Sequence, residues 1–209
     1  MKEVDHKNLR KCIAREAALL LYTSQEKEYK QAKRKAAKIL GVRVLPSNLE
    51  IALELDKIAQ EREGKERVQR LIQMREQALR IMETLARFHP KLVGSVWRGT
   101  IRYNSDIDIS VSSDNPHEVL EILRGNGFKI ERTEWQTVTK NGETKYSFHV
   151  YVDLPIGNKA EVVIVPSQER NSVWKCEIYG DKVTGLTINQ LKQVLKENPT
   201  KKFLPFKCQ

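Results

Sequence analysis

Apolar residues recur every three or four positions through the first 88 residues, which is the spacing of one face of an α-helix. The pattern predicts four helices. The first covers about Asn8–Thr23, the second ends at Gly41, the third follows Ser47 and ends at about Glu63, and the fourth covers Lys65–Phe88. This part of the chain is therefore expected to be almost entirely helical.

Two short segments in this helical part have the spacing of a capping box, in which a hydroxyl caps a helix and a following Glu returns to the free amide. They are Thr23–Glu26, which would start the second helix, and Ser47–Glu50, which would start the third. Gly64 ends the third helix and is the expected domain boundary, because the helix after it leads directly into the first strand. The expected domains are 1–64 and 65–209.

After Pro90 the pattern changes to alternation of apolar and polar residues, which is typical of strands. Asn115 precedes a proline at the first position of a helix that ends near Arg124, and Thr187 with Gln190 caps a last helix. The expected strands are 91–96, 106–112, 128–139, 145–154 and 159–165, with a hairpin turn around Asn141–Gly142. We therefore predict an α+β fold, in which a mixed β-sheet domain follows an α-helical N-terminal region.

Charge adds a candidate partner to this outline. The chain has 37 Lys and Arg against 27 Asp and Glu, a net charge of +10. Most of this surplus lies in the helical part, and the expected second helix presents Lys30, Lys33, Arg34 and Lys35. A basic helix face is typical of contact with nucleic-acid phosphates, although a solvated helix surface has the same composition. Both readings stay open at this point.

The cysteines and the hydropathy restrict the cellular setting. Cys12, Cys176 and Cys208 are far apart and lack the spacing of a zinc site, which favours a reducing compartment. No apolar run approaches the roughly 20 residues that span a bilayer, and residues 1–11 lack the apolar core of a secretion signal. A cytoplasmic protein without a membrane partner is expected.

The stretch Leu92–Val111 carries the chemistry. A short apolar strand runs into Gly94-Ser95, and Asp106 and Asp108 follow with one residue between them. Side chains alternate between the faces of a strand, so the two carboxylates project from the same face. A P-loop is excluded, because Gly94 and Gly99 have its spacing but no lysine follows Gly99.

These motifs resemble the nucleotidyltransferase superfamily, which has the fold of DNA polymerase beta and a Gly-Ser followed by Asp-x-Asp on a strand. The run Gly94–Thr100 is especially similar to the archaeal CCA-adding and poly(A) polymerase branch, and Ala160–Pro166 is similar to the strand that bears the third carboxylate there. The resemblance covers about Ile72–Pro166. It does not extend to the first 64 residues.

The resemblance implies a nucleoside triphosphate, with ATP as one candidate, and a pair of Mg2+ ions. Asp106 and Asp108 would hold the metal, since Mg2+ prefers oxygen ligands. Gly94, Ser95, Arg98 and Thr100 would bind the triphosphate, with Gly94 allowing close approach of the backbone and Arg98 offsetting charge.

The third carboxylate departs from the family pattern, because alignment on Val165-Pro166 puts Val163 where the related branch has aspartate. Glu161 lies two residues earlier on the same strand face. Asp153 is the competitor, and a loop centred on Gly157 would make Asp153 and Glu161 direct cross-strand neighbours. Either residue, or both, would complete the catalytic and metal-binding set.

The sequence thus predicts a metal-dependent nucleotidyltransferase that moves a nucleoside monophosphate to a hydroxyl, on RNA and with tRNA as one candidate. Two alternatives remain: a minimal nucleotidyltransferase that modifies a protein, as in antitoxin pairs, and a catalytically lapsed RNA-binding protein of the same fold. Trp97 and His149 are expected to serve packing rather than ligand binding.

Overall fold

The computed structural model describes residues 2–140, 143–172 and 174–205, and the chain divides into two compact units. One unit consists mainly of residues up to Arg67. The other begins at Val68 and contains the sheet. The hairpin turn expected at Asn141–Gly142, and Cys208, lie outside the described residues.

The first unit is built from α1 (Lys2–Tyr22), α2 (Tyr29–Ile39) and the beginning of α3 (Asn48–Thr84). Its core is rich in alanine, whose small side chain lets helices pack closely. The fully buried members include Ile13, Ala17, Ala18, Ala32, Ala36, Ile51 and Ile58. The predicted helical N-terminal region is therefore present, with α1 starting earlier than the periodicity indicated.

One of the two predicted capping boxes is present. Ser47 and Glu50 exchange the expected bonds, with Glu50 N–H donating to Ser47 Oγ at 3.2 Å and Ser47 N–H to Glu50 Oε2 at 2.7 Å. Arg10 also donates to Glu50 at 2.8 Å, and these partners hold the pKa of that carboxyl at about 2. The Ser47–Glu50 box is confirmed.

The box predicted at Thr23–Glu26 is wrong. The Thr23 hydroxyl donates back to Leu19 O at 2.9 Å, so it closes α1 instead of opening α2. Ser24 takes a left-handed conformation with φ 57°, and Glu26 forms an ion pair with Lys35 at 2.9 Å. A hydroxyl at a helix end can bond to either side, and the spacing does not decide which.

Gly64 interrupts α3, with a non-helical conformation of φ 50° and ψ −124°. Such a backbone suits glycine, which lacks the Cβ that disfavours positive φ. The predicted break in the helix is therefore present. The division into two domains at this residue stays a prediction, since the compact units separate a few residues later, after Arg67.

The second unit contains a five-stranded mixed sheet in the order β1-β2-β5-β4-β3. β2 and β5 are parallel, and the other neighbouring pairs are antiparallel. The strands are β1 (Lys91–Val93), β2 (Ile107–Ser112), β3 (Lys129–Lys140), β4 (Glu143–Asp153) and β5 (Lys159–Val165). The predicted α+β fold with a mixed sheet is confirmed.

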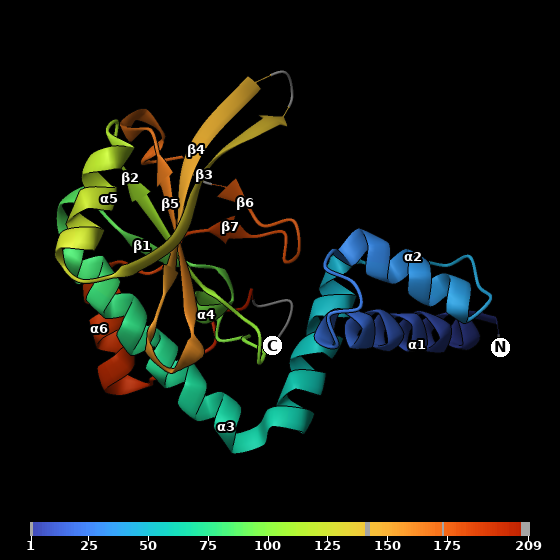
Figure 1. Ribbon diagram of the computed structural model, residues 1–209. Helices are drawn as coiled ribbons and strands as arrows, with labels where there is room; N and C mark the ends of the chain where they lie inside the picture. Colours follow the sequence, from blue (N-terminus) through green and yellow to red (C-terminus); the bar gives the residue numbers. More distant parts are fainter. Residues whose placement is uncertain (1, 141–142, 173, 206–209) are drawn as a thin grey trace. The chain divides into compact units, whose positions relative to one another are not determined.

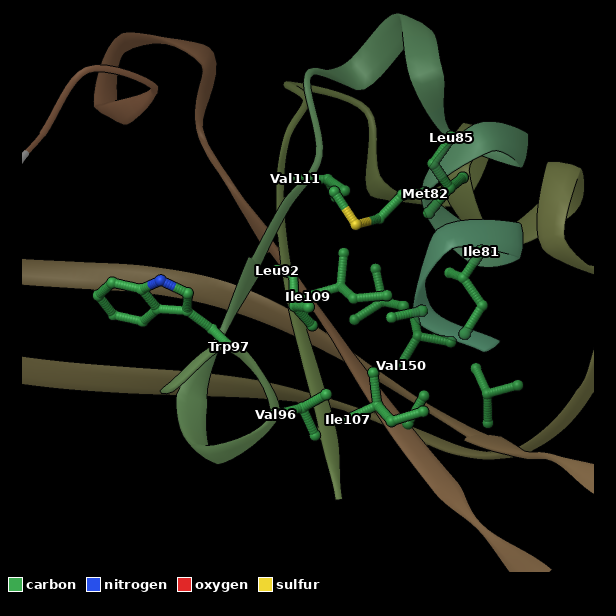
Figure 2. Packing of buried hydrophobic residues seen from close by; sticks show 14 of the residues in the cluster. Ile81, Met82, Leu85, Leu92, Val96, Trp97, Ile107, Ile109, Val111 and Val150 are labelled. Carbon is green, nitrogen blue, oxygen red and sulfur yellow. The ribbon is translucent and has the colours of Figure 1, made fainter. Parts of the chain in front are cut away.

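Helices cover only one face of this sheet. Figure 1 shows the second half of α3, α5 (Pro116–Gly125) and α6 (Ile188–Glu197) on the same side of it. Alternate residues of the strands, such as Ile107, Ile109 and Val150, point into this layer and meet Ile81 and Met82 of α3 (Figure 2). The opposite face carries the polar residues of the same strands, because side chains alternate along a strand.

The remaining elements are short. The strand predicted over 91–96 ends at Val93, because Gly94 turns the chain with φ 69° into α4 (Gly94–Arg98). Two further strands, β6 (Trp174–Lys175) and β7 (Lys182–Val183), had no clear signal in the sequence. Three 3-10 turns complete the described chain: Ala86–Phe88, Pro155–Gly157 and Ser167–Glu169. None of the described helices combines the length and the apolar character needed to cross a bilayer.

A buried arginine joins α3, α4 and the C-terminal segment. Arg75 is fully buried and donates to four backbone carbonyls: Val96 at 3.1 Å, Trp97 at 2.9 Å, Pro199 at 2.7 Å and Lys201 at 2.9 Å. Burial lowers its pKa to about 10, so the side chain stays charged at neutral pH. A buried cation is tolerated here because several of its donors have acceptors.

Replacement of Arg75 by methionine keeps much of the side-chain length and leaves these carbonyls without a donor. We expect Arg75→Met to lower the free energy of unfolding by about 3 kcal/mol or more, since each buried unpaired polar group costs about 1–3 kcal/mol. Urea denaturation measures the difference. Arg80→Met on the exposed face of the same helix is the matched control, expected within about 0.5 kcal/mol of wild type. Equal stability of the two variants would contradict the structural role of Arg75.

Candidate active site on the polar face of the sheet

Three carboxylates gather where β2 and β5 begin. Asp108 is the register partner of Glu161 on β5 and of Val93 on β1. Asp106 immediately precedes β2, after a turn in which Arg102 and Ser105 exchange backbone and side-chain hydrogen bonds of 2.9 Å. The two aspartates and the glutamate therefore come from neighbouring strands at one end of the polar face.

Gly94 and Asp108 are in direct contact. A Cβ placed on Gly94 would overlap the carboxylate of Asp108, with Asp108 Cγ only 2.8 Å away. Gly94 also has φ 69°, a conformation that other residues rarely adopt. The glycine is therefore required twice, once for the turn into α4 and once for the space that the carboxylate occupies.

The protein offsets the negative charges of the two aspartates only in part, through the positive charges of Lys159 and Arg102, which act on Asp106. Neither Asp106 nor Asp108 has a hydrogen-bond or ion-pair partner among the residues that the structure describes. Desolvation, followed by the charges of Glu161 and Asp106, raises the pKa of Asp108 to about 7. Desolvation and Glu161 also raise the pKa of Asp106. Shifts of this kind are typical of functional sites.

Glu161 is held in place by the neighbouring strand β4. Its Oε1 accepts from His149 Nδ1 at 2.6 Å, and the hydroxyl of Ser147 lies 2.8 Å from His149 Nε2. These contacts fix the orientation of the imidazole, with Nδ1 facing the carboxylate of Glu161 and Nε2 facing the hydroxyl of Ser147. Tyr151, the register partner of Glu161, donates to Glu134 at 2.8 Å, and desolvation, followed by the contacts with both glutamates, raises its pKa. His149 is thus more than a packing residue.

Asp153 lies elsewhere, and the pairing expected for it is wrong. Asp153 pairs with Lys159, and Tyr151 takes the place opposite Glu161. The turn between Asp153 and Lys159 is centred on Ile156, one residue before Gly157, and this shifts the pairing of the two strands by two residues. Lys129 donates to Asp153 at 2.7 Å, and this bond is the first cause of its lowered pKa. Its charge is therefore already paired, unlike that of Asp108.

The residues expected at the triphosphate lie in or directly after α4, but their side chains have different surroundings. Ser95 is half-buried in the first turn of α4, directly after Gly94, and Thr100 N–H donates to its carbonyl at 3.0 Å. Arg98 is buried and donates to Phe203 O at 3.1 Å, with its guanidinium 4.4 Å from the centre of the Trp97 ring. Arg98 therefore supports the C-terminal segment, and its expected contact with phosphate stays a prediction.

The four basic residues expected to contact nucleic acid differ in their surroundings. Lys33 donates to Asn48 at 2.8 Å, and Lys35 pairs with Glu26. Lys30 and Arg34 are exposed and lie one helical turn apart on α2. These two residues are the best placed of the four to contact a phosphate backbone.

The donor chemistry fits a divalent cation, whereas the present side-chain positions do not form a closed ligand cage. Mg2+ prefers carboxylate oxygens, and the uncompensated charge beside Gly94 supplies them. No group of three or more His, Cys, Asp or Glu side chains is gathered at ligand distance within the described ranges. The fit therefore rests on the carboxylate oxygens of Asp106, Asp108 and Glu161 as donors, and on the two aspartates having no hydrogen-bond or ion-pair partner among the described residues.

Sequence reasoning missed the support of Glu161 by His149 and Tyr151. Both residues alternate with apolar neighbours in β4, which shows that they share a face with each other. Their partner lies on another strand, and only the register between β4 and β5 identifies it. A correct position for the turn at Pro155–Gly157 would have revealed the contact.

Comparison with known proteins agrees with this geometry. Residues 75–176 match the model of the nucleotidyltransferase domain family. This segment contains Gly94, Ser95 and the three carboxylates, and it is a nucleotidyltransferase domain. The match covers nearly half of the chain, and it includes the whole candidate site. The closer resemblance to the archaeal branch stays a prediction.

Similar solved structures include a Cid1 poly(U) polymerase mutant bound to MgATP, with 16% identity over 46% of this chain and 32% of that chain, and a TM-score of 0.32. A cytoplasmic RNA terminal U-transferase shares 18% identity over 56% and 34% of the chains, with a TM-score of 0.28. The GLD-2/RNP-8 complex shares 14% over 57% and 44%, with a TM-score of 0.33.

The chain matches less than half of the length of each of these structures. Among curated proteins, the comparison finds no significant match.

The contact between Gly94 and Asp108 predicts a specific mutational effect. Gly94→Ala adds a methyl group at positive φ and displaces the Asp108 carboxylate, so we expect a loss of stability of about 2–4 kcal/mol, combining backbone strain and overpacking. Gly157→Ala is the matched control, because Gly157 has φ 77° and open space around it. It should lose only the strain energy, about 1 kcal/mol. Urea denaturation of both variants separates the clash from the strain, and equal losses would rule out the close contact.

Proposed function

We propose that the protein transfers a nucleoside monophosphate from a nucleoside triphosphate to a hydroxyl group on RNA. The observation that carries this proposal is the register pair Asp108–Glu161 beside Gly94, with Asp106 next to it. It brings three oxygen-donor side chains to the place where a phosphate-binding turn meets the sheet. The nucleotidyltransferase domain match supports the same reaction.

In the proposed reaction, the acceptor hydroxyl oxygen attacks the α-phosphorus, a new phosphodiester bond forms, and the bond to the β-phosphate breaks to release pyrophosphate. The backbone at Gly94 and the Ser95 hydroxyl bind the outer phosphates. Glu161 accepts the proton of the attacking hydroxyl, and His149 keeps its carboxylate aligned. Asp106, Asp108 and Glu161 would hold Mg2+, which when bound neutralises the charge that develops on the phosphates.

RNA as the acceptor rests on the excess of positive charge. The chain has a net charge of +10, and Lys30 and Arg34 form an exposed basic pair on α2. Charge of this kind attracts a polyanion, and RNA is a polyanion that also offers a terminal hydroxyl. The experiment has two competing outcomes. The protein could transfer the nucleotide to another protein, or it could bind RNA without any transfer activity.

Incubation of the purified protein with α-labelled nucleoside triphosphates, Mg2+ and total RNA tests the reaction. We expect labelled RNA with wild type and a loss of at least about a hundredfold in rate for Asp108→Asn and Glu161→Gln, because each removes a charged oxygen ligand for the Mg2+ that would stabilise the transition state. Asp153→Asn is the matched control, since its carboxylate is paired with Lys129, and it should keep most of the activity.

The outcomes separate the alternatives. A labelled protein band in place of labelled RNA would show that the acceptor is a protein. If nothing is labelled but the protein binds RNA in a salt-sensitive way, the protein is a catalytically lapsed enzyme that binds RNA. Full activity of Asp108→Asn would disprove the carboxylate site. Loss of activity in Asp153→Asn, with Glu161→Gln unaffected, would exchange the roles of the two residues.

The role of α2 has its own test. The double variant Lys30→Ser, Arg34→Ser should weaken binding of single-stranded RNA and reduce the salt dependence of log K by about 1.4, or about 0.7 for each lost phosphate contact. Fluorescence anisotropy over a range of KCl concentrations measures this slope. The control, Lys33→Ser with Lys35→Ser, removes the same charge from residues that are bound to Asn48 and Glu26. An equal change of slope in both double variants would show that the net charge of α2 attracts RNA and that Lys30 and Arg34 make no defined contact with a phosphate.

A further inference from the structure

A cavity of about 280 Å³ lies on the polar face of the sheet, further along the strands that carry the carboxylates. Its floor includes Val163 and Val165 of β5 and Ser110 and Ser112 of β2. Trp174 forms part of its wall and is about half exposed. The cavity thus combines an apolar floor, hydroxyl groups and an aromatic side chain, which is the composition of a site for a planar polar ring.

The position of this cavity relative to the carboxylates is fixed by the strands. Ser110 and Ser112 follow Asp108 on the same face of β2, and Val163 follows Glu161 on β5. At about 3.3 Å for each residue, the cavity begins roughly 7 Å from the carboxylates and extends to roughly 13 Å. One ligand molecule can therefore place one of its groups in the cavity and its reacting atom at the carboxylates.

The electrostatic character changes from acidic to basic along this path. A second cavity, of about 360 Å³, adjoins the first and shares His89, Lys91 and Arg170 with it. Neither Lys91 nor Arg170 forms an ion pair within the part of the chain that the structure describes. Lys145 also lines the first cavity, where it pairs with Glu169 at 3.1 Å and lies 4.8 Å from the Trp174 ring centre. Two cationic side chains thus remain available at the end remote from the carboxylates.

We propose that these two cavities bind the end of the acceptor RNA, with a nucleobase beside Trp174 and the preceding phosphates near Lys91 and Arg170. This proposal rests on the proposed function, because it places the terminal hydroxyl of the same RNA at Glu161. Aromatic side chains stack on every base, and a basic groove follows the backbone without reading sequence. The serine hydroxyls of the floor supply hydrogen bonds to the base edge.

The direction of β1 favours the acceptor over the incoming nucleotide. Gly94, which would face the triphosphate, follows the last residue of β1, whereas Lys91 is its first residue and His89 precedes it. The two cavities together extend away from the carboxylates and end at the positive charges of Lys91 and Arg170. A nucleoside triphosphate has its charges at the Gly94 end, and only a longer strand has phosphates at the other.

Binding of a short single-stranded RNA, labelled at its 5′ end and without nucleotide or Mg2+, tests the proposal by fluorescence anisotropy. We expect Trp174→Ala to weaken binding about tenfold and Trp174→Phe to stay within about threefold of wild type, because stacking needs only an aromatic ring. Trp135→Ala is the matched control, since Trp135 is more exposed but lies outside both cavities. It should bind as wild type does.

Transfer assays show whether the base beside Trp174 belongs to the acceptor RNA or to the nucleoside triphosphate. In transfer assays, Trp174→Ala should raise KM for RNA about tenfold and leave KM for the nucleoside triphosphate unchanged. Lys91→Ser with Arg170→Ser should reduce the salt slope of RNA binding by about 1.4. Circular dichroism of each variant shows whether it is folded, and Ser112→Phe, which fills the cavity from the other side, should reproduce the loss of RNA binding.

Three results would overturn the proposal: unchanged RNA affinity in both Trp174→Ala and Ser112→Phe, an effect of Trp174→Ala on KM for the triphosphate alone, or an equal loss in Trp135→Ala. The RNA-binding assay involves no transfer, so its result is independent of the reaction. A wild type that binds RNA through Trp174 and transfers nothing would refute the proposed function and leave this site intact.

Discussion

The bonds from Arg75 to four backbone carbonyls fix the part of the structure on which the site depends. Val96 and Trp97 belong to α4, whose short length leaves its last carbonyls without helical donors. The guanidinium supplies those donors and, through Pro199 and Lys201, connects α4 to the C-terminal segment. Gly94 begins this same helix, so the turn that we propose to bind phosphate is held by an arginine on α3 that touches none of the carboxylates.

Once Gly94 is fixed, Asp108 has little freedom, because its carboxylate lies against the glycine backbone and opposite Glu161. The arrangement crowds negative charge where desolvation already disfavours it, which is why the pKa of Asp108 reaches about 7. A sequence optimised for stability alone would place a lysine here. The sheet does so at Asp153, where Lys129 neutralises the charge, and the contrast marks the uncompensated group as functional.

Alternation along single strands was readable from the sequence, and relations between strands were not. The limits of β5 and the shared face of Asp108 and Ser110 follow from residue patterns alone. The partner of Glu161 depends on the turn at Pro155–Gly157, where Ile156 takes φ 68° and the turn is centred one residue before Gly157, a shift that no local rule indicates. Arg98 shows a second limit, since a charged residue in a motif gives no sign of whether it faces a ligand or the protein interior.

The register also bears on the proposal that Glu161 serves as the third carboxylate, although the archaeal branch that the motifs resemble has its carboxylate at another position. Alignment puts it at Val163, but Val163 pairs with Ser110, one step along the strands from Asp108, whereas Glu161 pairs with Asp108 itself. A carboxylate at 161 keeps the three acidic groups together at the end of the face where His149 can hold it. The valine at 163 then leaves an apolar floor for the adjoining cavity. One substitution pattern on β5 thus separates the charged end of the face, suited to phosphate chemistry, from a neighbouring surface suited to a base.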